Sequence, residues 1–183
     1  MVSPFTFVGS HPDKVKTHDD LRFMQLLTSL LTPFVPLATR WAQDQESKIL
    51  KTGRALTPTQ RKDAIKAGVK HPEKIRIKVV RSIKAPDGLL GLASKFADAF
   101  GPDVAGATYG YGIFIRRDCA NYRAHRELHL HEFTHVGQYE RYGAIHAFLV
   151  DYLHECVDPG YGKGRLEKQA DRRAKKIVRA IKR

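Results

Sequence analysis

The sequence predicts an α+β protein with a small mixed sheet and a mostly helical C-terminal half. Two segments, 74–83 and 107–117, show the two-residue periodicity of strands, and three helical segments follow them. Strands and helices do not alternate regularly along the chain, which argues against repeated strand–helix–strand units. At 183 residues, of which 42% are hydrophobic, the chain is long enough for one domain with a sizeable core.

The N-terminal part is predicted to be helical. We expect residues 1–50 to form a segment that is loosely packed or covers a cleft, ahead of a main domain over 51–183. Helical spacing over 19–32 and 37–52 supports this division. The most apolar run, 23–38, is too short to span a bilayer and is interrupted by two prolines. It indicates a buried or partner-facing helix, and no transmembrane segment is expected.

The main domain is predicted to begin with a helix and a strand. Thr57 and Pro58 form a typical N-cap and first helical position, and the helix that they start should end near Gly68. In 74–83, isoleucine and valine alternate with lysine and arginine, which predicts a half-exposed strand. A short helix is expected over 88–101.

The next strand is predicted over 107–117, with three helices after it. Its two glycines would leave room on one face for the close approach of another backbone or a ligand. The opposite face would carry Tyr109, Tyr111, Ile113 and Ile115. The helices are expected at about 122–142, 144–156 and 165–182.

The composition gives the protein a strong positive charge. A net charge of +13 predicts attraction to polyanions or to acidic substrates. The two cysteines, Cys119 and Cys156, lie in no Cys-x-x-Cys pair, so a thiolate metal site is not expected and their disulfide state stays open. The first residues show no export signal, which favours the cytoplasm as the compartment.

The segment "HEFTH" at 131–135 fits the pattern His-Glu-x-x-His. In a helix, His131 and His135 lie one turn apart on the same face, where two imidazoles can bind one tetrahedral zinc ion. Glu132 lies beside the first imidazole, where it can act as a general base toward water bound to the metal. Apolar residues surround this segment on nearly every side, so its polar groups need partners, which a metal would supply.

Two further histidines precede this pair. His125 and His129 are also four residues apart, but the helical rotation turns them roughly 80–160° away from His131 and His135. No glutamate follows the first of them directly. We therefore expect them to be surface residues or residues that support the ligands.

The third ligand is predicted near the C-terminus. The longer pattern HExxHxxGxxH fails, because Gln138 and Arg141 stand where its glycine and third histidine would be. In the very basic segment 165–182, Glu167 and Asp171 fall at the edge of the apolar stripe, about 40° apart. Glu167 is therefore the expected ligand, and Asp171 the acceptor of the second N–H of a zinc-bound histidine.

Two alternatives to this third ligand stay open. The two carboxylates could simply pair with neighbouring lysines and arginines at helical spacing. Glu155, beside His154, is a rival ligand, but it has no carboxylate one turn further on.

Together, HExxH and the later Glu-x-x-x-Asp pair resemble the gluzincin zinc metallopeptidases. "HEFTHVGQYERYG" and "LEKQADRRA" look more specifically like small bacterial gluzincin-like proteins that carry HE(L/F)THVxQ, and the resemblance covers residues 57–175. It implies a zincin-like fold in which the strand at 107–117 forms the sheet edge beside a central HExxH helix. An extended peptide could add to that edge as another strand.

The resemblance implies a zinc-dependent metallopeptidase that hydrolyses peptide bonds. Zn²⁺ would be held by His131, His135 and Glu167, with Glu132 as the catalytic base. Tyr161 is the expected oxyanion donor, with Tyr152 and His154 as the next candidates. Peptide substrate is expected along 109–115, so the substrate-binding residues are predicted to be Tyr161 and Tyr111.

Two other classes of function stay open. The protein could bind nucleic acid or another polyanion through the basic face of 165–182, with any zinc structural, although the chain lacks zinc-finger spacings and interleaved aromatic and basic residues. It could also be a catalytically silent relative, or an effector delivered to another cell. The substrate and the oligomeric state do not follow from the sequence.

Overall fold

The structure is a computed structural model that describes residue 29 and residues 32–84, 104–155 and 163–181. The expected helix over 88–101, most of the expected helix over 19–32, and Cys156 and Tyr161 lie outside the described residues. The elements, in chain order, are the short 3-10 helix η1 (Thr32–Phe34), α2 (Val35–Thr52), β1 (Arg54–Ala55), α3 (Pro58–Lys66), η2 (Pro72–Lys74), β2 (Arg76–Val80), β3 (Gly106–Tyr109), β4 (Gly112–Arg116), η3 (Arg117–Cys119), α5 (Arg126–Tyr142), α6 (Ile145–Glu155) and α7 (Arg165–Ile181).

The four described strands form one mixed sheet in the order β1-β2-β4-β3. Strand β2 runs parallel to β4, whereas β1 and β3 pair antiparallel to their neighbours. The predicted α+β class, with a small mixed sheet and a mostly helical C-terminal half, is confirmed. Strand β3 lies at one edge of the described sheet and contacts α5.

The prediction of one strand over 107–117 is wrong, because this segment turns back on itself as the hairpin of β3 and β4. Gly110 adopts φ +57°, which two-residue hairpin turns require and which other residues rarely adopt. The N–H of Tyr111 donates to the carboxylate of Glu46 on α2 at 2.8 Å and so anchors the turn. Tyr109 and Tyr111 therefore do not share one face of a strand.

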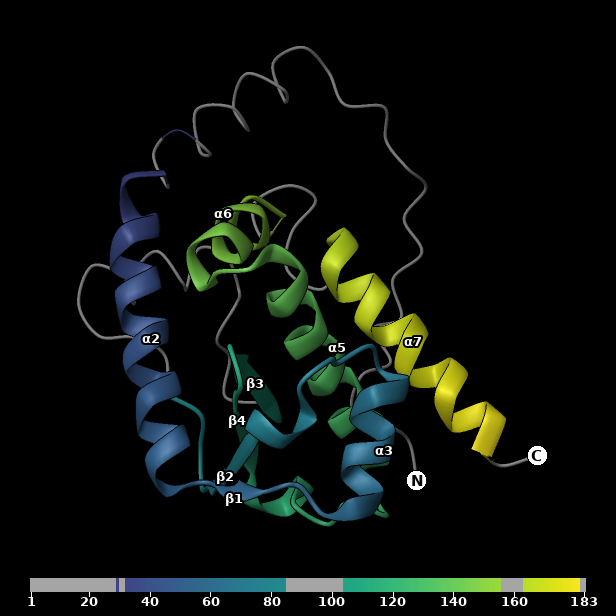
Figure 1. Cartoon of the computed structure of the whole chain (residues 1–183). Helices are drawn as coiled ribbons and strands as arrows, with labels where there is room; N and C mark the ends of the chain where they lie inside the picture. Colours follow the sequence, from purple (N-terminus) through teal and green to yellow (C-terminus); the bar gives the residue numbers. More distant parts are fainter. Residues whose placement is uncertain (1–28, 30–31, 85–103, 156–162, 182–183) are drawn as a thin grey trace.

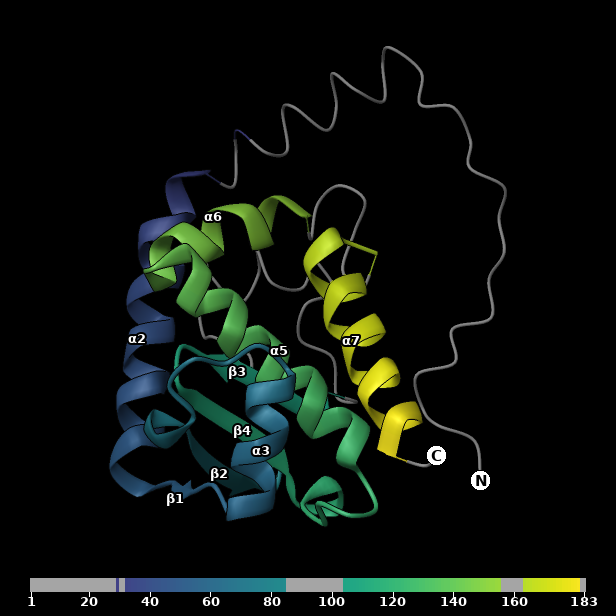
Figure 2. The same cartoon turned by 45° about the vertical axis from the view of Figure 1, so that its right-hand side comes forward.

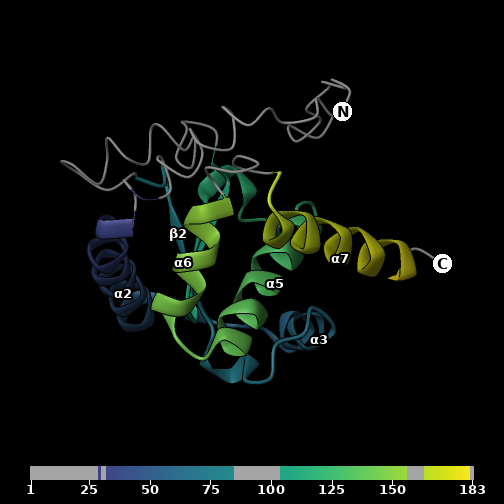
Figure 3. The same cartoon turned by 90° about the horizontal axis from the view of Figure 1, so that it is seen from above.

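Helices cover both faces of the sheet. Figures 1 and 3 show α2 along one face and α5 along the other, with α7 packed on the side of α5 that faces away from the sheet. Figure 2 shows α6 above the sheet, between the upper ends of α2 and α7. Helix α5, which carries the His-Glu-x-x-His motif, is thus the central helix of the described structure.

The core has two parts, on either side of the sheet. One lies between the sheet and α5, and its largest members are Ile75, Ile77, Ile113, Ile115, Leu130 and Phe133. The other joins α2 to α6 and to the start of α7, and includes Ala42, Ile49, Tyr139, Phe148 and Leu166. Burial of Leu130, Phe133 and Val136 on α5 confirms the predicted buried helix. None of the helices in the described ranges is both long and apolar enough to cross a membrane.

Local sequence signals explain the ends of the helices beside the site. Thr57 and Gln60 form a reciprocal capping box at the start of α3, as the Thr57–Pro58 pair predicted. Helix α5 begins four residues later than expected, at Arg126, because the side chain of Asn121 accepts the N–H groups of Arg123 and Ala124 and holds a turn there. It ends where Gly143 adopts φ +74°.

Candidate metal centre

His131, His135 and Glu167 converge on one point between α5 and α7. One side-chain donor atom from each lies within 4.8 Å of the other two, so the group could hold a metal ion. The Nε2 atoms of the two imidazoles are 2.9 Å apart. The carboxylate oxygens of Glu167 lie 3.2 Å from Nε2 of His131 and 3.3 Å from Nε2 of His135.

The packing of α7 on α5 brings the carboxylate to the imidazoles. Leu166, Ala170 and Ala174 form the buried stripe of α7, and Glu167 follows directly at its edge. Glu155 at the end of α6 accepts the N–H of Leu166 at 2.8 Å and so helps to place the first turn of α7. The position of Glu167 at the edge of the apolar stripe therefore places its side chain near the imidazoles of α5.

Each imidazole is oriented through its other nitrogen. Nδ1 of His131 lies 2.9 Å from a carboxylate oxygen of Asp171, the supporting acceptor expected from the sequence. Nδ1 of His135 lies 2.8 Å from the side-chain oxygen of Gln138, whose amide nitrogen donates to the backbone oxygen of Leu166 at 3.0 Å. Since both acceptors require Nδ1–H, each ring directs Nε2 toward Glu167.

The donor set fits zinc. Zinc–nitrogen and zinc–oxygen bonds of about 2.0–2.2 Å place two ligands of a tetrahedral ion roughly 3.3–3.5 Å apart. The separations of 2.9, 3.2 and 3.3 Å in this group are close to that spacing. Two imidazoles and one carboxylate, each imidazole supported by a second hydrogen bond, are also ligands that zinc accepts.

His131 and Glu167 form an ion pair within this group. Burial opposes the charge on His131, but Asp171 and Glu167 outweigh this effect and raise the pKa of His131 to about 10. Burial likewise opposes the charge on Glu167, whereas the two imidazoles hold its pKa well below its usual range. The site thus favours an anionic carboxylate facing a positive charge, which a divalent cation would supply.

Glu132 is held beside this group by strand β3. Its side chain is 4% exposed, and one carboxylate oxygen accepts the hydroxyl proton of Thr108 at 2.7 Å. Gly106, on the same strand, leaves space for the carboxylate, because a Cβ there would lie 2.5 Å from its Oε1 atom. Neither residue was predicted; the only signal was a threonine at the start of the predicted edge strand, with a glycine just before that strand.

Adding a methyl group at Gly106 should therefore disturb Glu132 without touching the metal ligands. For the peptide cleavage that the sequence leads us to expect, Gly106→Ala should shift the Glu132 carboxylate and lower kcat/KM by roughly ten- to a hundredfold, because small displacements of a catalytic group have effects of this size. Metal content should not change. Ala107→Ser is the matched control, since it adds one atom at the next position, on the opposite face of the strand. Wild-type kcat/KM for Gly106→Ala would show that this contact does not position Glu132.

Other candidates from the sequence lie apart from the group. Tyr111 is in the β3–β4 turn, where its hydroxyl donates to Glu140 at 3.1 Å, and the structure does not bring it to the three ligands. Glu155, the rival ligand, instead accepts the N–H of Leu166 and pairs with Arg165 at 3.2 Å.

His129 is neither a surface residue nor a support for the ligands. It is 1% exposed, and its Nε2 lies 3.3 Å from the backbone oxygen of Cys119. Burial lowers the pKa of His129 to about 4, although the hydrogen bond to Cys119 opposes the shift. Its ring packs edge-on against Tyr122 and Phe133. It is therefore a core residue, because the Cys119 backbone and the rings of Tyr122 and Phe133 enclose it.

Two polar residues complete the surroundings of the ligands. Tyr152 on α6, named in the sequence only as a secondary oxyanion candidate, donates its hydroxyl to Glu167 at 2.8 Å. Gln138 links His135 to α7 and is fully buried. Its role was not predicted, although a glutamine three residues after the second histidine of a buried helix is a signal that could have revealed it.

Comparisons with protein-family models, with curated proteins and with solved structures give no match for this chain. The assignment of the site therefore depends on its own geometry and chemistry.

Proposed function

We propose that the protein is a zinc-dependent metallopeptidase of the gluzincin type, with a zincin-like fold. The observation that carries the proposal is the convergence of two histidines one turn apart with a carboxylate from a separate helix, with Glu132 beside the first histidine. Three protein ligands, rather than four, are typical of catalytic zinc sites, which leave one position for water or substrate. Among the residues that the structure describes, this count supports hydrolysis over a structural zinc.

Each residue has a distinct part in the proposed reaction. Bound zinc would supply Lewis acidity, which polarises the scissile carbonyl and lowers the pKa of water. Glu132 would accept a proton from the attacking water as the new C–O bond forms, and would then donate it to the amine nitrogen, so that the C–N bond breaks in a second step. Thr108 holds the Glu132 carboxylate through the hydrogen bond at 2.7 Å.

Strand β3 is the proposed place for the substrate backbone. It is the outer strand of the described sheet, and it carries both Gly106 and Thr108 beside Glu132. An extended peptide that paired with this edge would bring its backbone past the Glu132 carboxylate.

Metal analysis combined with cleavage of a degenerate peptide library tests the proposal. We expect about one zinc per chain, as a single three-ligand site implies, and new peptide termini detected by mass spectrometry. Removal of zinc with a chelator should abolish cleavage, and addition of Zn²⁺ should restore it. A protein that keeps its zinc but leaves the library intact would instead fit the catalytically silent alternative.

A further inference from the structure

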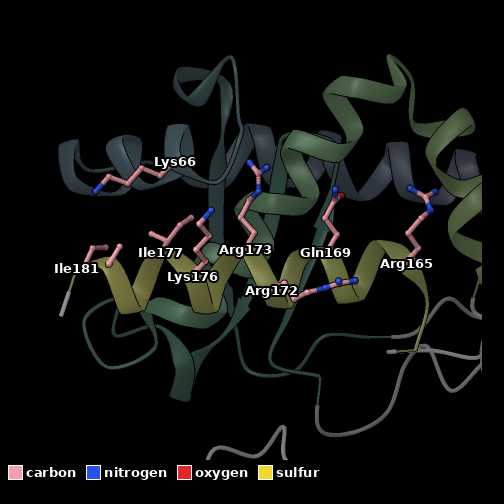
Figure 4. A pocket seen from close by; sticks show the side chains of 9 residues that line it. Lys66, Arg165, Gln169, Arg172, Arg173, Lys176, Ile177 and Ile181 are labelled. Atoms are coloured by element: carbon pink, nitrogen blue, oxygen red, sulfur yellow. The ribbon is translucent and has the colours of Figure 1, made fainter. Parts of the chain in front are cut away.

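The outer face of α7 forms a second, separate feature of the molecule. An open groove of about 740 Å³ runs along this helix beside the end of α3. We call it the basic groove; its lining residues are Lys66, Arg165, Gln169, Arg172, Arg173, Lys176, Ile177, Ala180 and Ile181. Figure 4 shows Arg165 and Arg173 extending from α7 toward the neighbouring helices, with Lys66 approaching from α3.

The groove is positively charged, and nearby carboxylates neutralise only part of this charge. No acidic side chain from the described part of the chain belongs to its lining. Among the described residues, ion pairs hold Lys66, at 3.8 Å from Asp63, and Arg165, at 3.6 Å from Asp151 and 3.2 Å from Glu155. In those same parts of the chain, Arg172, Arg173 and Lys176 form no ion pair with a carboxylate.

The pKa of the neighbouring Arg141 reflects the same excess of positive charge. Burial lowers the pKa of Arg141 on α5, and the nearby charges of Arg173 and Arg165 lower it further. Arg141 donates to Gln169, a residue of the groove, at 3.1 Å. The cationic surface therefore extends from α7 to α5.

The far end of the groove is apolar. Ile177, Ala180 and Ile181 continue its lining toward the C-terminal end of α7, and Ile181 is 38% exposed. The lining residues that the structure describes include no aromatic ring on which a base could stack. Cations next to exposed aliphatic side chains match a ligand that carries both carboxylates and apolar side chains more closely than a nucleic acid.

The groove is also distinct from the metal centre. Glu167 and Asp171 lie on the side of α7 that faces the imidazoles, whereas the polar and cationic groove residues of α7 lie roughly 120–180° around the helix from Glu167. A ligand in the groove would therefore leave the metal ligands free.

We propose that the basic groove is a docking site for an acidic, amphipathic polypeptide segment. Its carboxylates would pair with Arg172, Arg173 and Lys176, and its apolar side chains would cover Ile177 and Ile181. The charge of the groove and the aliphatic end of its lining both support this occupant. The inference does not depend on peptidase activity, because it concerns binding alone.

Equilibrium binding of a designed peptide tests the inference. The probe is a fluorescent helical peptide of about 20 residues, which spans about 30 Å, with glutamates on one face and leucines on the other. Binding is measured by fluorescence anisotropy at about 0.15 M salt, where the Debye length of about 8 Å limits non-specific attraction. The full-length protein carries Glu132→Gln throughout, so that the probe stays intact.

Charge reversal distinguishes the groove from the general charge of the protein. We expect Arg172→Glu with Lys176→Glu to raise the Kd about tenfold or more, since two attractive pairs become repulsive. Both residues are exposed, so the fold should not change. Lys48→Glu with Lys51→Glu on α2 is the matched control, because it changes the net charge equally on the opposite side of the molecule (Figure 1), and it should leave the Kd within about twofold.

Three outcomes would overturn the inference. The first is an equal loss of binding in the groove variant and the α2 control. The second is an unchanged Kd when serines replace the leucines of the probe. The third is tighter, groove-dependent binding of duplex DNA or of phosphatidylserine vesicles, which would assign the groove to a phosphate-bearing partner instead. None of these depends on zinc or on cleavage, so failure here is separable from failure of the proposed hydrolysis.

Discussion

Replacing Glu132 with glutamine is expected to abolish the proposed peptide hydrolysis while leaving the proposed metal site intact. The substitution keeps the size of the side chain but removes its ability to accept a proton from water. General bases contribute about a hundred- to ten-thousandfold to rates, so kcat/KM should fall by on the order of a thousandfold. Zinc content should not change, because the three ligands His131, His135 and Glu167 remain.

The control for this variant is Glu127→Gln on the same helix. Glu127 is exposed in the first turn of α5, and the same chemical change there should leave kcat/KM near the wild-type value. The measurements are zinc content, the helical signal in circular dichroism and initial rates on the peptide identified in the library. Undiminished cleavage by Glu132→Gln would remove Glu132 from the reaction.

Replacing Glu167 with alanine should weaken zinc binding more than any change in the surrounding residues. Loss of a residue that only supports a ligand typically lowers metal affinity by about ten- to a hundredfold. We therefore expect Asp171→Asn to lower the zinc affinity by about ten- to a hundredfold, because it weakens the contact with Nδ1 of His131. Glu167→Ala removes a ligand itself, so its loss of affinity should exceed about a hundredfold.

Competition for zinc with a chromogenic chelator measures both affinities on one scale. Glu127→Ala, which removes an exposed carboxylate from α5, should bind zinc like the wild type. Circular dichroism confirms that each variant is folded. If Glu167→Ala kept wild-type affinity, the ion would lie elsewhere and the ligand set would be wrong.

The site was more predictable than the strands around it, for physical reasons. Helical geometry places residues four apart on one face whatever surrounds them, so His131 and His135 followed directly from spacing. Glu167 followed from the contrast between a carboxylate and the basic residues of α7. The β3–β4 turn could not be predicted in this way, because alternating apolar and small residues fit a long strand and a hairpin equally well. The backbone of Gly110 decided between them.

Contacts between distant segments were the least predictable. Thr108 reaches Glu132, and Gln138 reaches Leu166, only after the sheet and α7 have packed on α5. The basic groove needs Lys66 from α3 beside α7, and no local pattern relates these two helices. The sequence predicted a charged helix face, whereas only the packing reveals that a second helix closes one side of it.

The proposed ligands are divided between α5 and α7, which would link metal affinity to the order of the C-terminal helix. In the unfolded chain Glu167 is not held near the imidazole pair, so an ion would bind tightly only after α7 has docked. By mass action, zinc at about a hundred times its dissociation constant would then add about 2.7 kcal/mol to the free energy of unfolding. The ion would act as a non-covalent cross-link, and a chain shortened before Arg165 would have no tight site.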